Sequence, residues 1–379
     1  MKILITGDFC PRDRIARKIE NDEKDVFSKA VLEQIAKADY AVTNFECAVA
    51  DASVPGIPKC GPHLHCSDKA VRYLKTSGFD CVTLANNHFR DYGDVGVKLT
   101  LAALNDRGID YVGGGVNIEE AIKTLYKTFD GFNVAFINVC ENEFSIASGN
   151  RGGSAPLDVI DVCHRIKEAK TQGTKYVIVI VHGGHEHWQY PSPRMKKWYR
   201  FFLESGADAV VNHHQHCFSG YEEFRGKPIF YGLGNLCFDH PKKRGGIWNE
   251  GYMVLLDIQE TGIRYDLIPY RQCDESPSVE LITGSQKQSF DQMVNAISKT
   301  IADDRMLEEK WNDYVNKRSQ TVVTPFTPYF TGYARAAAGR HWFPYMMPKR
   351  KVADMLNFIQ CEAHRDLLSL AMQKKLEQE

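Results

Sequence analysis

The sequence predicts an α/β fold in which a sheet of largely parallel character is covered by helices on both faces. Two observations lead to this class. Short apolar runs alternate with segments of helical period through about the first 230 residues, and these runs are continuously apolar instead of alternating. Strands that alternate with helices indicate parallel pairing, and unbroken apolar runs are typical of strands buried on both sides.

The apolar runs and the segments of helical period give the individual elements. The apolar runs predicted as strands are residues 3–6, 40–43, 81–84, 134–139, 176–181, 209–211 and 229–231. The amphipathic stretches predicted as helices are residues 25–38, 67–76, 95–107, 118–128, 157–171 and 193–204. Residues 253–258 and 262–268 predict a hairpin with its turn at Glu260, Thr261 and Gly262.

A change in composition predicts a domain boundary near residue 272. Residues 1–272 contain the strand and helix pattern, whereas residues 273–379 are more polar and have helical period at 288–301 and 353–374. We therefore expect an α/β domain followed by a mainly helical C-terminal region.

Charge and cysteine content narrow the class of protein. The formal net charge of -1 gives no global field toward nucleic acid, so nucleic acid is not an expected partner. The sequence has no apolar run of about 18 residues, so no transmembrane segment is expected. The eleven cysteines lack CxxC spacing, and the apolar N-terminus runs directly into Gly7 and Asp8, as a first strand would. These features favour a cytoplasmic protein with free thiols over a secreted one.

Polar residues come directly after the predicted strands. The acids, amides and imidazoles in these positions are Asp8, Asn44, Glu46, Asn87, His182, His214, His216 and Asn235. In open α/β sheets, ligands bind beyond the carboxyl ends of the strands. Taken singly, Asp8 could end a strand, Asn87 could cap a helix and His182 could be a core imidazole. Together they predict one site, because purely structural residues would be scattered over both ends of the sheet.

The residue types in this set point to metal ions. Imidazoles, carboxylates and a carboxamide without clustered thiolates suit divalent Mn, Fe or Zn. A carboxylate can bridge two cations because it has two oxygens, and a ligand set of this size favours a two-metal site about 3.5–4 Å across. Such a site can bind a phosphate oxygen and lower the pKa of a bridging water.

The motifs also resemble a known family. They are, in order, GD at residues 7–8, NxE at 44–46, NNHxxDxG at 86–93, His182 with Glu186, HxH at 214–216 and YGLGN at 231–235. This order resembles the CapA family of bacterial capsule and poly-γ-glutamate synthesis proteins, which belongs with the calcineurin-like metallophosphoesterases. The resemblance covers residues 1–240. It implies a sandwich of mixed β-sheets flanked by helices, here with a helical C-terminal appendage.

The resemblance implies roles for the site residues. Asp8 and His216 would bind the first metal ion, and Asn87, His182 and His214 would bind the second, with Glu46 as the bridge. One departure is that Asp8-Phe9-Cys10 stands where the wider superfamily has Asp-x-His. Whether Cys10 is a thiolate ligand is left open.

The remaining motif residues are expected to act on the substrate. By the resemblance, His88 lies outside the metal shell and protonates a leaving oxygen or stabilises the transition state. Asp91 would hold the ring of His88. Asn44, Glu186 and Asn235 are expected to line the pocket or contact the substrate.

The implied function is that of a metal-dependent hydrolase in capsule or cell-envelope polymer biosynthesis. Water activated by two metals would attack a phosphoester, and the partner would be a phosphorylated or polyanionic small molecule or polymer. Two alternatives stay open. One is a non-hydrolytic, metal-containing protein that assembles or binds capsule polymer or poly-γ-glutamate, and the other is a hydrolase of γ-glutamyl amides.

Overall fold

The computed structural model describes residues 1–323 except 52, 60 and 130, and beyond them residues 332–340, 342, 355 and 359. The chain divides into two units, Met1–Leu307 and Glu308–Glu379. The strands that the structure describes all lie in the first unit, as does α8 (Gly284–Ala302). The domain boundary expected near residue 272 stays a prediction.

The first sheet combines a parallel half with an antiparallel half. Its order is β18-β17-β16-β1-β2-β5-β6, with β15 also paired with β1. The parallel strands are β1 (Lys2–Phe9), β2 (Tyr40–Phe45), β5 (Cys81–Thr83), β6 (Asp110–Val112) and β15 (Asn235–Cys237). The antiparallel strands are β16 (Glu250–Gln259), β17 (Gly262–Gln272) and β18 (Val279–Leu281). The hairpin predicted from the sequence is thus confirmed as β16 and β17, which are longer than expected.

The second sheet has a parallel centre and antiparallel edges. Its order is β13-β14-β12-β11-β9-β8. The strands are β13 (Tyr221–Phe224), β14 (Lys227–Phe230), β12 (Ala209–His213), β11 (Tyr176–His182), β9 (Phe132–Cys140) and β8 (Leu125–Phe129). Two small pairs join β3 (Ala48–Val49) to β4 (His65–Cys66) and β7 (Gly114–Gly115) to β10 (Gly153–Ser154). The edge strands β8 and β13 are the antiparallel ones.

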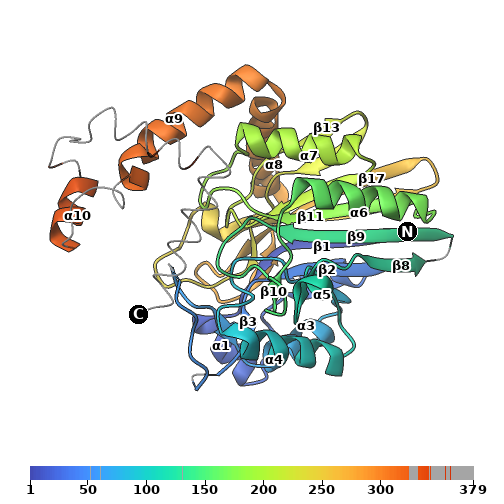
Figure 1. Ribbon diagram of the computed structural model, residues 1–379, viewed down its shortest axis with the longest axis horizontal. Coiled ribbons are helices and arrows are strands. Elements are labelled where there is room, and N and C mark those ends of the chain that lie inside the picture. Colours follow the sequence, from blue (N-terminus) through green and yellow to red (C-terminus); the bar gives the residue numbers. More distant parts are fainter. Residues whose placement is uncertain are drawn as a thin grey trace. The chain divides into compact units, whose positions relative to one another are not determined.

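The two sheets pack on each other, and helices cover their outer faces (Figure 1). The helices beside the second sheet are α6 (Val159–Thr171), α7 (Pro193–Glu204) and α8. Those beside the first sheet are α1 (Asp13–Glu20), α2 (Lys29–Ile35), α3 (Lys69–Thr76) and α4 (Gly93–Asp106). Side chains alternate along β1, so Ile3 and Ile5 join the core between the sheets while Leu4 joins the core under the helices. The predicted sandwich of mixed sheets flanked by helices is confirmed.

One helix prediction differs from the structure, and one helix was not predicted. The helix expected over residues 118–128 is wrong in its second half, because α5 (Ile118–Ala121) ends early and β8 follows as an antiparallel edge strand. Burial alternates along β8, which gives the period of a strand. Helix α1 was not predicted, although its buried Ile15 and Ile19 have the i, i+4 spacing of one helical face.

The C-terminal region, residues 273–379, is mainly helical where the structure describes it, and β18 is its strand. Helix α9 (Asp304–Val323) and α10 (Gly332–Gly339) follow α8, and the short 3-10 helix η1 (Ile247–Asn249) precedes β16. The helix expected at 353–374 falls almost wholly outside the described residues. Among the described helices, none combines the length and the apolar character required to cross a bilayer.

Gly7 allows the close approach that aligns β1 with β15. A Cβ atom at residue 7 would lie 1.9 Å from the carbonyl oxygen of Gly234, and the next residue, Asp8, pairs with Asn235. We expect Gly7→Ala to lower the free energy of unfolding by roughly 2 kcal/mol or more, because backbone must shift to admit the methyl group. Urea denaturation measures this change.

Gly246→Ala is the matched control for this prediction. Gly246 has an extended backbone, with φ -137° and ψ -177°, and open space around it. Its substitution should change the urea midpoint little. Equal midpoints for the wild type and Gly7→Ala would contradict the prediction.

Candidate metal centre

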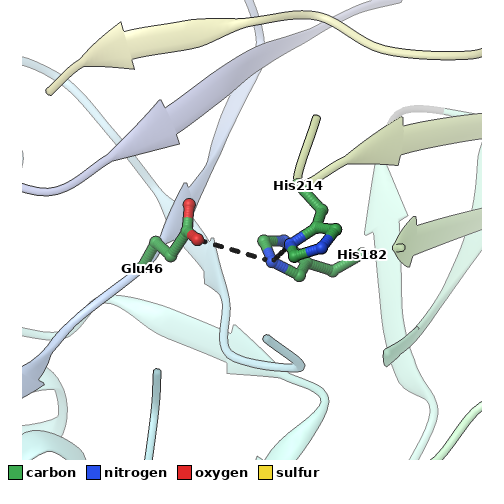
Figure 2. Close-up of side chains that lie close together, drawn as sticks. All are labelled: Glu46, His182 and His214. Carbon is green, nitrogen blue, oxygen red and sulfur yellow. Dashed lines mark hydrogen bonds and ion pairs between the residues drawn. The ribbon is translucent and has the colours of Figure 1, made fainter. Parts of the chain in front are cut away.

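Side chains from both sheets meet where the parallel strands end. Asp8 is near the end of β1, Glu46 follows β2, and His182 is the last residue of β11. His214 and His216 follow β12 in a loop where both have positive φ, 93° and 53°. All five side chains are buried. Figure 2 shows Glu46 from the first sheet facing His182 and His214 from the second.

Two groups of possible ligands share the carboxylate of Glu46. One is Asp8, Glu46 and His216, and the other is Glu46, His182 and His214; within each group the ligand atoms lie within 4.8 Å of one another. Oδ1 of Asn87 adjoins the second group, 3.0 Å from Nε2 of His182. The structure therefore brings together all the residues that the resemblance implies as ligands, and their binding of ions remains a proposal.

The environment of Glu46 fits a cation. Among the described residues, neither carboxylate oxygen has a hydrogen-bond partner, although both are buried. Oε1 lies 3.5 Å from Nε2 of His182 and 3.7 Å from Nε2 of His216. A buried carboxylate without a partner is costly, so these oxygens require a proton or a cation. The donor set of imidazoles and carboxylates suits a divalent transition metal.

The hydrogen bonds of Asn235 fix the tautomer of His216. The Asn235 amide donates from Nδ2 to the carbonyl oxygens of His216 and Trp248, each at 3.2 Å, so Oδ1 is the acceptor. This oxygen accepts a hydrogen bond of 2.8 Å from Nδ1 of His216. In the neutral ring, Nε2 therefore presents a lone pair toward Glu46. Two acceptors that face each other are compatible when a cation or proton lies between them.

Asn44 supports the ligands in a similar way. Its Nδ2 donates to Oδ1 of Asp8 at 2.8 Å and lies 3.2 Å from Nδ1 of His182. Its Oδ1 accepts from Asn86 and from Thr83. Asn44 and Asn235 are expected to line the pocket or contact the substrate. In the structure both are fully buried and bond ligand side chains, and a substrate contact stays a prediction.

His88 and Asp91 form a buried pair beside this centre. Nδ1 of His88 lies 2.7 Å from Oδ2 of Asp91, which also accepts from the backbone N–H of Leu64. The sequence did not single out Lys59, whose ammonium bonds Asp91. Asn86 also had no assigned role, and its Oδ1 accepts from the backbone N–H of His88 at 3.1 Å. Its place in the NNH motif was the available signal.

Two other expected residues, Glu186 and Cys10, are not in either ligand group. The side chain of Glu186 is 50% exposed, and its carboxylate lies 4.0 Å from Nε2 of His187. Cys10 is buried and contacts the thiol of Cys47, which in turn lies 3.4 Å from the sulfur of Cys66. In the part of the chain that the structure describes, Cys10 belongs to neither ligand group.

Comparison with known proteins identifies the family. Residues 2–240 match the family described as bacterial capsule synthesis protein PGA_cap. The chain belongs to this family. The capsule biosynthesis protein CapA of Bacillus anthracis is 26% identical over 307 residues, covering 79% of this chain and 74% of that protein. The PGA biosynthesis protein CapA of Bacillus subtilis (strain 168) is 31% identical over 277 residues, 72% of each chain.

A solved structure is similar at lower identity. A novel phosphatase of Mycoplasma pneumoniae aligns with a TM-score of 0.44 and 14% identity, covering 73% of this chain and 95% of that one. The family resemblance stated from the motifs is confirmed by the PGA_cap match, which includes all the candidate ligands.

Burial sets the ionisation of this PGA_cap centre. It raises the pKa of Asp8 to about 8, helped by the nearby charge of Glu46, and it also raises the pKa of Glu46 to about 8. Burial and neighbouring imidazoles hold the pKa of His182 and of His214 well below the ordinary value. The imidazoles of His182 and His214 are therefore neutral at physiological pH, which is the state in which histidine binds a metal.

The raised carboxyl pKa values predict how the metal-free protein responds to pH. The folded chain keeps protons on Asp8 and Glu46 that the unfolded chain releases near pH 4. The stability that these two carboxyls contribute is therefore fully present below about pH 4 and is lost as the pH rises toward about 8. Glu46→Gln removes one of these buried charges. In a chelator, its melting temperature should exceed that of the wild type by roughly 5 °C at pH 8 and equal it at pH 4.

Thermal denaturation at the two pH values, with EDTA present, measures this difference. The order should reverse at pH 8 when Mn²⁺ is added, because a ligand that binds only the folded wild type stabilises it. Identical melting temperatures of the two metal-free proteins at pH 8 would contradict the prediction.

Proposed function

We propose that this protein is a binuclear metal-dependent hydrolase that acts on a phosphoester in the production of capsule or cell-envelope polymer. One observation carries the proposal. The buried Glu46 carboxylate has two oxygens without hydrogen-bond partners among the described residues, and it is shared by two groups of possible ligands. A carboxylate so placed is suited to bridge two cations.

We assign separate roles in metal binding to the residues of the site. Two bound divalent ions would supply the Lewis acidity that activates water and neutralises the charge of a phosphoester. Asp8 and His216 would hold one ion, Asn87, His182 and His214 the other, and Glu46 both. Asn44 and Asn235 keep the ligand side chains in place through their hydrogen bonds to Asp8 and His216.

His88 is proposed as the proton donor to the leaving oxygen. Its Nδ1 faces Asp91 at 2.7 Å, so Nε2 is the ring nitrogen left for the substrate. Asp91 orients the ring, as a carboxylate does for many functional histidines. The side chain of His88 is almost completely buried, so a proton held at Nε2 is shielded from bulk water.

The substrate class comes from the relatives and from the chemistry of the centre. Two of the relatives are named for capsule biosynthesis and for PGA biosynthesis. We therefore propose a phosphorylated or polyanionic polymer, or its precursor, as the partner. A cytoplasmic location is part of the proposal, supported by the buried, unbridged thiols of the described cysteines.

Metal content tests the binuclear centre. We expect about two Mn, Fe or Zn ions per wild-type chain by elemental analysis, and about one or fewer in Glu46→Ala, because the bridge contributes to both positions. Glu222→Gln is the control, since Glu222 is a buried carboxylate bonded to Arg200 and Tyr231 and belongs to neither ligand group. Its metal content should equal that of the wild type. A wild type that retains no metal after incubation with Mn²⁺ would overturn the proposal.

Turnover tests the reaction. The Mn²⁺-loaded protein should hydrolyse p-nitrophenyl phosphate or its diester, and His88→Asn should lower kcat by about 100-fold with unchanged metal content, because general acid catalysis is lost. His164→Asn, on the exposed face of α6, is the control and should leave kcat unchanged.

The same assay separates the alternative functions. Cleavage of γ-glutamyl p-nitroanilide without cleavage of phosphoesters would replace the proposal with amide hydrolysis. Tight binding of poly-γ-glutamate by the metal-loaded protein, with no turnover of either class, would replace it with a binding role.

A further inference from the structure

A buried lysine lies against the His88–Asp91 pair. Lys59 is in the segment between β3 and β4, and its side chain is only 3% exposed. Its ammonium donates to Oδ1 of Asp91 and lies 3.2 Å from Nδ1 of His88. Lysine is rarely buried, because removing an ammonium from water is costly unless it is paired. Its position therefore calls for an explanation.

The segment that carries Lys59 is fastened to Asp91 at several points. The backbone N–H of Ile57 donates to the carbonyl oxygen of Asp91 at 2.9 Å, and the backbone N–H of Leu64 donates to Oδ2 of Asp91 at 2.7 Å. Nε2 of His63 donates to the carbonyl oxygen of Ile57 at 2.7 Å. These bonds on both sides of Lys59 hold its side chain against the carboxylate.

The bonds to Asp91 leave its carboxylate little freedom to rotate. Oδ2 accepts from His88 and Leu64, and Oδ1 accepts from Lys59. Because a carboxylate only accepts, the 2.7 Å contact requires the hydrogen on Nδ1 of His88. The positive charge of Lys59 also balances the negative charge of Asp91, so the pair adds no net charge beside an anionic substrate.

We infer that Lys59 is a positioning residue for His88. It fixes the Asp91 carboxylate, and through it the ring of His88, so that Nε2 faces the substrate. This inference rests on the proposed function for its catalytic consequence, but the orientation of His88 is measurable without turnover. Lys59 reaches Asp91 across 32 residues of sequence and needs no contact with the substrate or with a metal ligand.

The test compares Lys59→Met with Lys59→Arg in the full-length, Mn²⁺-loaded protein acting on a p-nitrophenyl phosphodiester. We expect Lys59→Met to lower kcat about tenfold, with KM within about twofold and unchanged metal content, because the effect passes through His88 in the transition state. Lys59→Arg keeps the charge and should recover most of kcat. If Lys59→Met does not fold, Lys59→Gln takes its place with the same expectations.

Lys196→Met is the matched control. The Lys196 side chain is 4% exposed, and its ammonium bonds Asp304 and the carbonyl oxygen of Ile301, neither of which belongs to the proposed site. Its loss should lower the melting temperature without lowering kcat. Equal losses of kcat in the two methionine variants would overturn the inference, because they would reflect general destabilisation.

Proton NMR of the metal-free protein gives the readout that does not need activity. The hydrogen-bonded Nδ1 proton of His88 should appear far downfield in the wild type, be absent from His88→Asn, and broaden or vanish in Lys59→Met. An unchanged resonance in Lys59→Met would overturn the inference. If the wild type turns over no phosphoester, the proposed function fails, and this resonance alone decides the role of Lys59.

Discussion

The buried carboxylate of Glu46 is the constraint on which the centre depends. It follows β2 of the first sheet, and from the second sheet Nε2 of His182 and Nε2 of His216 approach Oε1 at 3.5 and 3.7 Å. Neither of its oxygens has a hydrogen-bond partner among the described residues. Burying this carboxylate therefore lowers the stability of the fold unless a proton or a cation is bound to it. The packing of the two sheets therefore buries Glu46 in a place where it requires a proton or a cation. The core between the sheets, with Ile3 and Ile5 from β1, is what holds the two halves of the centre together.

Much of the fold could be predicted because its strands are buried on both sides. Continuous apolar runs located β1, β2, β9 and β11, and the polar residues after β1, β2 and β11 located the site edge. The error at residues 118–128 has a physical cause. The alternation of Leu125 to Phe129 fits an edge strand, but only the pairing with β9 decides it over a continued helix. Pairing of this kind depends on tertiary contacts that a local sequence pattern does not contain.

The sequence predicted which residues come together at the candidate site, but not which hydrogen bonds their side chains make. The approach of Asp8, Glu46 and His182 follows from strand ends alone. Asn44 and Asn235, by contrast, were expected to line the pocket or contact the substrate, and in the structure their buried side chains bond Asp8 and His216. Lys59 had no sequence signal, since its segment lacks periodicity and its partner lies 32 residues away.

The charges around the centre explain why cation binding and anion binding must be coupled in the proposed function. Asp8 and Glu46 are acidic, and the nearby carboxylates of Glu143 and Glu186 also raise the pKa of Glu46. An anionic substrate is repelled by this field when the acids are ionised and no cation is present. Two divalent ions would offset the negative charge of these four carboxylates, so they would favour the substrate. By linkage, the substrate then strengthens ion binding by the same factor. The opposite charges of Lys59 and Asp91 cancel. The net charge at the centre therefore depends on the acidic residues around it and on the ions that they would bind.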